Sequence, residues 1–111
     1  MKIERQTVGT VEVCAPQDAL VDEGAEEFAS ELKAFLGRPN PRVVISMKGV
    51  GYMDSIALEG LVTAAEELAE RSQQLKMAGV TPTCREILEL TGLAGRFQFF
   101  KDVDAAVRSF L

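Results

Sequence analysis

Residues 43–69 read VVISMKGVGYMDSIALEGLVTAAEELA, an apolar run followed by a glycine-containing loop and an amphipathic stretch. The run Val43–Met47 is almost continuously apolar, which is typical of a central strand that is buried on both faces of a sheet. After the loop, apolar residues recur at helical spacing: Leu58, Leu61, Val62, Ala65, Leu68 and Ala69. A buried strand that leads into an amphipathic helix predicts an α/β domain with Val43–Met47 near the centre of its sheet.

The residues before this stretch predict a β-hairpin and a helix. Two alternating runs lie on either side of Gly9-Thr10: Ile3, Arg5 and Thr7 alternate with Glu4 and Gln6, and Val11 and Val13 alternate with Glu12. This pattern favours a hairpin with one buried face. The hairpin is followed by a predicted helix, which ends naturally at Gly37. The segment Gly37–Pro41, which is rich in Gly and Pro, then predicts a loop. The apolar positions of this helix are Ala25, Phe28, Ala29, Leu32, Phe35 and Leu36.

The residues after this stretch predict two more strands and two more helices. Leu75–Val80 is a plausible strand, and Thr81-Pro82 has the N-cap and first-turn residues of a helix. Phe97–Phe100 fits a short edge strand with aromatic side chains in the core. The helix that Thr81-Pro82 opens has its apolar positions at Cys84, Ile87 and Leu88 and ends before Gly92. A last helix begins at Asp102 and has its apolar positions at Val103, Ala106, Val107 and Phe110.

The complete order is therefore ββαβαβαβα within a single domain that spans residues 1–111. Alternating strands and helices predict a small mixed, largely parallel sheet with right-handed crossovers, and we expect the helices mainly on one face. In such sheets functional loops lie beyond the carboxyl ends of the strands. The loops Ala15–Val21 and Lys48–Ser55 and the pair Thr81-Pro82 are the candidates.

Composition argues against several classes of function. The net charge is −5 and Lys and Arg do not cluster, so nucleic acid is not an expected partner. No stretch approaches the roughly 20 apolar residues that span a bilayer, and Met1–Arg5 lacks the apolar run of a signal peptide. We therefore expect a cytoplasmic protein that does not insert into membranes.

The chain contains no histidine and two cysteines, Cys14 and Cys84, which lie far apart in the sequence. Histidine is the usual general base and the commonest transition-metal ligand. In a reducing cytosol the two cysteines are most simply buried thiols. We expect no cofactor, no metal site and no catalytic residue, and hence a binding protein that is not an enzyme.

The strongest local signal is Asp54-Ser55, which follows two glycines and opens the helix after the central strand. Asp and Ser are favoured N-cap residues because their side chains accept the unpaired N–H groups of the first helical turn. They could do no more than cap the helix. Alternatively, free N–H groups and the positive end of the helix dipole would favour a phosphate on the Ser55 hydroxyl.

The pattern Tyr52-Met53-Asp54-Ser55 with Leu58, placed after a Val/Ile-rich strand, resembles the signature of STAS domains of the bacterial anti-sigma-factor antagonist type. The resemblance extends from about Val43 to Leu111 and includes Thr91-Gly92-Leu93. It implies that Ser55 is phosphorylated by a partner that is both anti-sigma factor and serine kinase. The unphosphorylated antagonist binds this partner, the phosphorylated form releases it, and a phosphatase resets Ser55.

Two departures from the family pattern widen the range of partners. Ile56 and Ala57 stand where a Ser or Thr and then a Gly usually follow the acceptor, and Asp18–Val21 replaces the usual Gly-x-Leu-Asp loop. A non-enzymatic STAS scaffold subunit of a stress-signalling or lipid-transport complex is therefore the alternative function. In either case we expect a partner surface formed by Asp54, Ser55, Ile56 and Glu59, with help from Gln17 and Asp18.

Two other classes fit less well. A receiver domain would place its Asp near Asp54 and its Lys near Lys101, but it needs an acidic pair after the first strand to bind Mg²⁺, and the sequence has none there. A serine hydrolase would need a base beside Ser55 and a Gly-x-Ser-x-Gly turn. Only Lys48 is near in the sequence, and the turn is absent.

Overall fold

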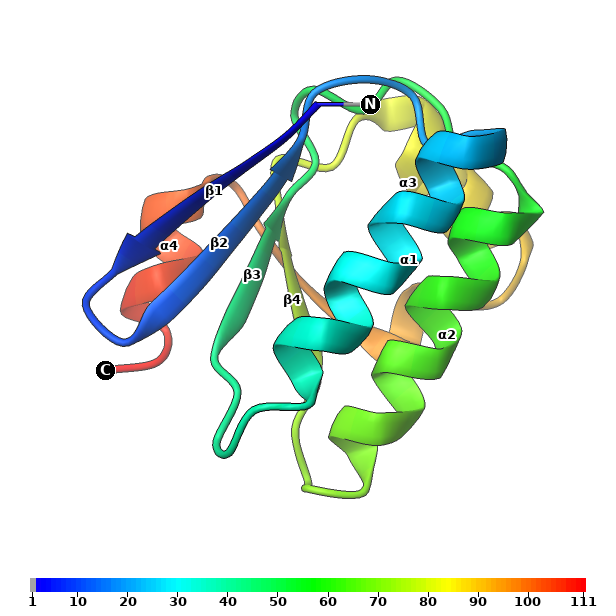
Figure 1. The fold of residues 1–111 in the computed structure, drawn as a ribbon. Coiled ribbons are helices and arrows are strands. Elements are labelled where there is room, and N and C mark those ends of the chain that lie inside the picture. Colours follow the sequence, from blue (N-terminus) through cyan, green and yellow to red (C-terminus); the bar gives the residue numbers. More distant parts are fainter. Residues whose placement is uncertain (1) are drawn as a thin grey trace.

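The computed structural model describes residues 2–111 and contains one five-stranded sheet in the order β1-β2-β3-β4-β5. The strands are β1 (Ile3–Val8), β2 (Val11–Pro16), β3 (Val43–Ser46), β4 (Leu75–Ala78) and β5 (Phe97–Phe100). The β1–β2 pair is antiparallel and the other three pairs are parallel. This arrangement confirms the predicted mixed sheet with its central strand in the middle (Figure 1).

Four helices cover the two faces of the sheet unequally. They are α1 (Asp22–Leu36), α2 (Ser55–Ala69), α3 (Pro82–Leu90) and α4 (Val103–Arg108), and a 3₁₀ turn spans Ala94–Arg96. Helices α1, α2 and α3 share the larger apolar core, whereas α4 packs on the opposite face of the sheet. The prediction of helices mainly on one face is thereby confirmed.

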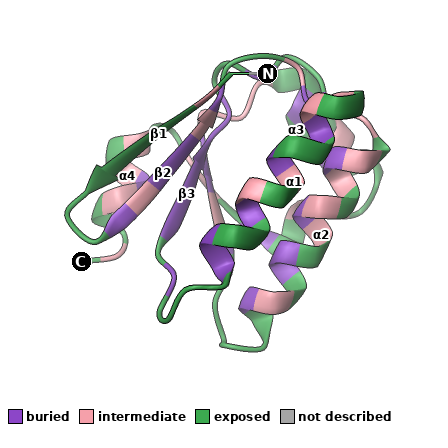
Figure 2. Ribbon diagram, in the orientation of Figure 1, coloured by how far each residue is buried: buried purple, intermediate pink, exposed green. Residues whose placement is uncertain are grey.

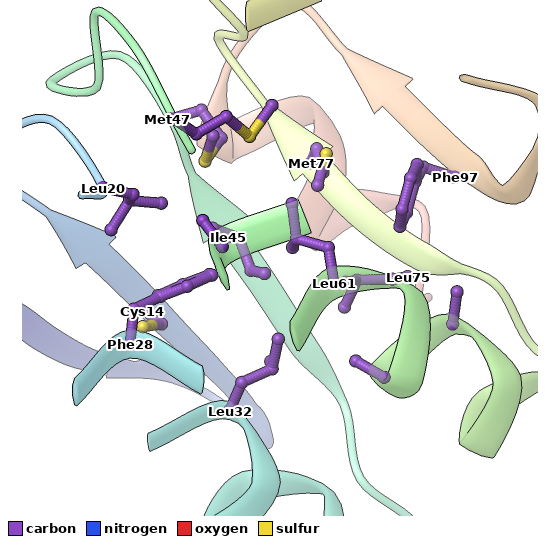
Figure 3. Close-up of a cluster of buried hydrophobic side chains, with 14 of the residues drawn as sticks. Cys14, Leu20, Phe28, Leu32, Ile45, Met47, Leu61, Leu75, Met77 and Phe97 are labelled. Carbon is purple, nitrogen blue, oxygen red and sulfur yellow. The ribbon is translucent and has the colours of Figure 1, made fainter. Parts of the chain in front are cut away.

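The core forms around β3, whose four residues are all buried (Figure 2). Val44 contributes to the small cluster under α4, whereas Ile45 contributes to the larger cluster under the other helices. Figure 3 shows Ile45 among buried side chains from the sheet and from α1 and α2. Both faces of β3 are therefore apolar for the expected reason: each face is covered by helices.

Both cysteines are buried free thiols, as predicted. Burial raises the pKa of the Cys14 thiol to about 12, so that this group stays protonated and unreactive at neutral pH. Phe97 is buried, and Phe99 and Phe100 are half-buried against the two faces of the sheet. The aromatic side chains of β5 thus belong to the core and do not form a surface patch.

One expectation about the first hairpin is wrong. The turn and pairing are as predicted, but β1 is exposed along almost its whole length, and it is β2 that is buried. The alternation does place Ile3 and Arg5 toward α1, where Ile3 packs against the core and Arg5 forms an ion pair with Glu31. Because β1 is an edge strand beyond the reach of most of the helix layer, its inward face is only partly covered.

Helices α1 and α2 lie side by side (Figure 1), and Gly60 of α2 lies close to Ala29 of α1. A Cβ atom at Gly60 would lie 2.8 Å from the Cβ atom of Ala29, which is too close unless one helix shifts. The two helices can therefore pack this tightly only because position 60 has no side chain.

We expect Gly60→Ala to lower the free energy of unfolding by about 1 kcal/mol. Glycine to alanine inside a helix normally stabilises by roughly 0.5–1 kcal/mol, but overpacking against Ala29 costs about 1–3 kcal/mol. Urea denaturation would measure the change. The double variant Gly60→Ala/Ala29→Gly should be less destabilised than the sum of its parts, and strict additivity would contradict this account.

Candidate functional site

The loops after β2 and β3 meet beyond the carboxyl ends of these strands, as the sequence predicts. Leu20 and Met53 form a parallel bridge, in which the Leu20 N–H donates to the Tyr52 carbonyl at 2.9 Å and the Asp54 N–H donates to the Leu20 carbonyl at 2.9 Å. Both bridging side chains are buried. A Cβ atom at Gly49 would lie 3.0 Å from the Pro16 carbonyl, so glycine permits the close approach of the two loops.

The Asp54 carboxylate joins the start of α2 to the start of α1. Its Oδ1 atom accepts hydrogen bonds from the N–H groups of Ile56 at 3.0 Å and Ala57 at 3.1 Å, as an N-cap does. Its Oδ2 atom accepts one from the N–H of Asp22 at 2.8 Å. Asp22 has a left-handed φ of 50°, a conformation that Asp tolerates better than most residues.

These bonds keep Asp54 ionised. The Asp22 N–H, aided by those of Ala57 and Ile56, lowers the pKa of the Asp54 carboxyl against the opposing effect of burial. The sequence suggested a cap here, and the structure confirms it. The further bond to Asp22, 32 residues away in the sequence, has no local sequence signal.

Ser55 is the first residue of α2 and is exposed to solvent. The hydroxyl therefore stands accessible beside a fixed, negatively charged carboxylate. The sequence led us to expect free N–H groups at the start of α2, but the structure differs from this expectation. Those of Ile56 and Ala57 are already bonded to Asp54, so they are not available to a phosphate on Ser55.

The loop between β4 and α3, which contains Thr81, packs beside the β3–α2 loop and forms hydrogen bonds with it. Thr81 stands at the predicted N-cap position of α3, but its hydroxyl donates to the Val50 carbonyl at 2.9 Å and makes no cap bond with its own helix. The Cys84 thiol also donates to that carbonyl, at 3.4 Å. Val50 itself is fully buried. The loop that presents Ser55 is thus anchored at Val50, Met53 and Asp54.

The other predicted partner residues lie on the surface, with one exception. Gln17, Asp18 and Glu59 are exposed; Gln17 lies against Gly49 of the neighbouring loop, and Glu59 lies one turn along α2 from Ser55. Ile56 is only half-buried and packs against the core. It is therefore both a core residue and an apolar element of the surface.

Tyr52 is a surface residue that the sequence analysis did not include among the partner residues. Its side chain is 51% exposed, although it lies between the buried residues Val50 and Met53. An exposed aromatic side chain on an anchored loop is a common element of protein interfaces. The available signal was its position: a large aromatic residue in a glycine-containing turn immediately before Asp54-Ser55.

The described part of the chain has two further features that bear on other functions. Within residues 2–111 there is no group of three or more His, Cys, Asp or Glu side chains that could hold a metal ion. None of the helices formed by these residues is long and apolar enough to cross a membrane.

Comparisons with known proteins find relatives by sequence and by fold. BtrV of Bordetella bronchiseptica, provisionally named an anti-sigma factor antagonist, is 24% identical over 110 residues, which cover 99% of this chain and 95% of BtrV. A Thermotoga maritima protein with the same provisional name superposes with a TM-score of 0.86 at 18% identity, over 96% of this chain and 92% of that one. The anti-sigma factor antagonist SpoIIAA in its unphosphorylated form gives 0.78 at 14% identity, over 98% and 96%.

At these identities the two solved structures establish the fold alone. The family model for the STAS domain, however, matches residues 2–106, nearly the whole chain. The Asp-Ser pair that suggested this family lies, as expected, at the start of the helix that follows the central strand. The chain belongs to the STAS domain family.

Proposed function

We propose that this protein is an anti-sigma-factor antagonist that binds an anti-sigma factor when Ser55 is unphosphorylated and releases it when Ser55 is phosphorylated. The names of the relatives BtrV and SpoIIAA support the class of function. The observation that carries the proposal is the exposed Ser55 hydroxyl on an anchored loop, beside the Asp54 carboxylate. A kinase needs an accessible hydroxyl in a fixed position, and a reversible switch needs a large change of charge.

The chemistry requires nothing of this chain beyond the hydroxyl group. The partner kinase supplies ATP, the Ser55 Oγ atom forms a bond to the γ-phosphorus, ADP departs, and the hydroxyl proton passes to a base of the kinase. A phosphatase restores the hydroxyl by hydrolysis. We propose accordingly that the protein works in the cytoplasm, has no catalytic residue or cofactor of its own, and has two protein partners, the anti-sigma factor with serine kinase activity and the phosphatase.

The partner surface that we propose consists of Ser55 with Asp54, Ile56 and Glu59, flanked by Gln17, Asp18 and the exposed ring of Tyr52. An affinity experiment tests the switch: wild-type protein and Ser55→Ala serve as baits in lysate of the host organism, with ATP. We expect both baits to capture one ATP-dependent serine kinase, Ser55 of the wild type to become phosphorylated, and Ser55→Ala to retain the kinase longer. Kinase capture without modification of Ser55 would contradict the switch.

One observation favours the alternative, a STAS scaffold subunit. Ile56 packs against the core and places a bulky apolar side chain next to the hydroxyl, where a kinase must approach. Capture of large scaffold assemblies by both baits, with no phosphate on Ser55, would support a stress-signalling scaffold. Capture of transporter subunits would support a role in a lipid-transport complex.

The half-buried position of Ile56 leads to a quantitative prediction. Ile56→Ala should weaken binding of the captured partner by tenfold or more, because an apolar anchor at an interface often contributes about 2 kcal/mol. Isothermal titration calorimetry on the folded variant would measure the affinity.

Leu58→Ala is the matched control. Leu58 is also half-buried and packs against the same core, but it lies outside the proposed partner surface. It should lose stability and keep its affinity. Equal affinities for wild type and Ile56→Ala would assign Ile56 to the core alone.

A further inference from the structure

A groove runs between α1 and α2 on the outer surface of the helix layer. Its volume is about 310 Å³. The residues at its floor are apolar or small, and the residues at its rim are charged. The lining residues from α1 are Glu26, Ala29, Leu32, Lys33 and Leu36, and those from α2 are Ile56, Glu59, Gly60, Thr63, Ala64 and Glu67.

The dimensions of the groove suit a helix. Its lining extends from residue 26 to residue 36 along α1, which corresponds to roughly 15 Å or three helical turns. Small residues form its centre, because Gly60 and Ala29 bring the two helix backbones close together. Amphipathic helices bind in grooves of this kind by laying apolar side chains on the floor.

The charges around the groove indicate which helix would fit. Its rim carries three carboxylates, Glu26, Glu59 and Glu67, and one ammonium group, Lys33. The two helices together have five acidic residues on α1 and three on α2, against that single lysine. A second copy of this chain would bring the same acidic surface against itself, whereas a Lys- or Arg-rich helix would be attracted.

We propose that the α1–α2 groove is a docking site for a basic amphipathic helix of the partner protein. The groove is continuous with the Ser55 surface, because Ile56 and Glu59 belong to both. Only the identity of that partner, the anti-sigma factor, rests on the proposed function. The groove adds a contact that reaches as far as Glu67, about three turns away from Ser55 along α2.

A synthetic helix tests the groove without the natural partner. The probe is a peptide of about 14 residues, long enough to fill the groove, with Leu at helical spacing on one face and Lys elsewhere. Two-dimensional ¹H–¹⁵N NMR would follow its binding to the whole protein. We expect saturable shifts of the amide signals of Ala29, Gly60 and Thr63, and no shifts with a control peptide in which Glu replaces every Lys.

Neighbouring glutamates of α2 provide a matched pair of variants. Glu67 lines the groove, whereas Glu66 is exposed and does not, and both substitutions by Lys change the net charge equally. Glu67→Lys should weaken peptide binding by roughly tenfold, and Glu66→Lys should change it by less than about twofold. Thr63→Phe, which fills the groove from an exposed position, should abolish the shifts at Gly60.

The outcomes separate this inference from the proposed switch. Ser55→Asp should keep its affinity for the peptide, because the added charge lies outside the lining of the groove. Saturable shifts at the groove with the expected variant effects support the docking site even if Ser55 is never phosphorylated. An absence of binding, shifts located on another surface, or equal effects of Glu67→Lys and Glu66→Lys would overturn it, whatever the state of Ser55.

Discussion

Phosphorylation of Ser55 should weaken binding of the partner kinase more than a hundredfold and leave the fold intact. The exposed hydroxyl lies in the middle of the proposed partner surface, so a phosphate there would have to be desolvated against a surface that fits a hydroxyl. Burial of an unpaired charge costs several kcal/mol, and about 3 kcal/mol already corresponds to more than a hundredfold in affinity.

The fold should be insensitive to the same change. The phosphate gains little from the helix start, because Asp54 already accepts the hydrogen bonds from Ile56 and Ala57. Repulsion from the Asp54 carboxylate is screened by solvent at this exposed position. We therefore expect the phosphorylated protein and Ser55→Asp to melt within a few degrees of the wild type, as circular dichroism would show.

Ser72→Asp is the control for added charge. Ser72 is exposed at the other end of α2, where its left-handed φ of 58° suits Asp. This variant should bind the partner like the wild type. A partner that binds wild type and phosphoprotein equally well would refute the switch and leave Asp54-Ser55 as a helix cap.

Asp54→Ala should lower the melting temperature by roughly 5 °C or more. The substitution leaves three backbone N–H groups, those of Asp22, Ile56 and Ala57, without their acceptor. It also removes the hydrogen bond that links the start of α1 to the Asp54 side chain at the start of α2. The variant should bind the partner weakly, because the loop that presents Ser55 loses one of its anchors.

Asp54→Asn separates the two parts of this effect. The remaining side-chain oxygen can still accept from Ile56 and Ala57, whereas the amide group cannot accept from Asp22. Its loss of stability should therefore be smaller than that of Asp54→Ala. Equal melting temperatures for Asp54→Asn and wild type would show that the link to Asp22 contributes nothing.

The stability difference between wild type and Asp54→Asn should depend on pH. The pKa of Asp54 is lowered in the folded protein from its ordinary value of 3.8, so the carboxylate stabilises the fold fully above about pH 5 and loses this effect as the pH falls through the folded pKa. Urea denaturation at pH 7 and near pH 3 should show the difference shrinking in acid. A difference that grows in acid would contradict the assignment.

The sequence alone determined the order of the elements and the location of the candidate site. The apolar run Val43–Met47 specified the central strand, because a strand covered on both faces needs apolar residues at consecutive positions. The pair Asp54-Ser55 specified the start of α2, because an N-cap depends only on the next three residues. Both signals are local, so neither required knowledge of the rest of the chain.

The tertiary structure decided the features that depend on segments far apart in the sequence. The bond from Asp22 to Asp54 joins residues that lie 32 positions apart in the sequence. The half-buried position of Ile56 and the groove depend on how α1 packs on α2, where Gly60 meets Ala29. The exposure of β1 likewise follows from how far the helix layer extends over the sheet. Alternation and spacing show which face a side chain shares with its neighbours in the chain, but the coverage of that face is set by long-range packing.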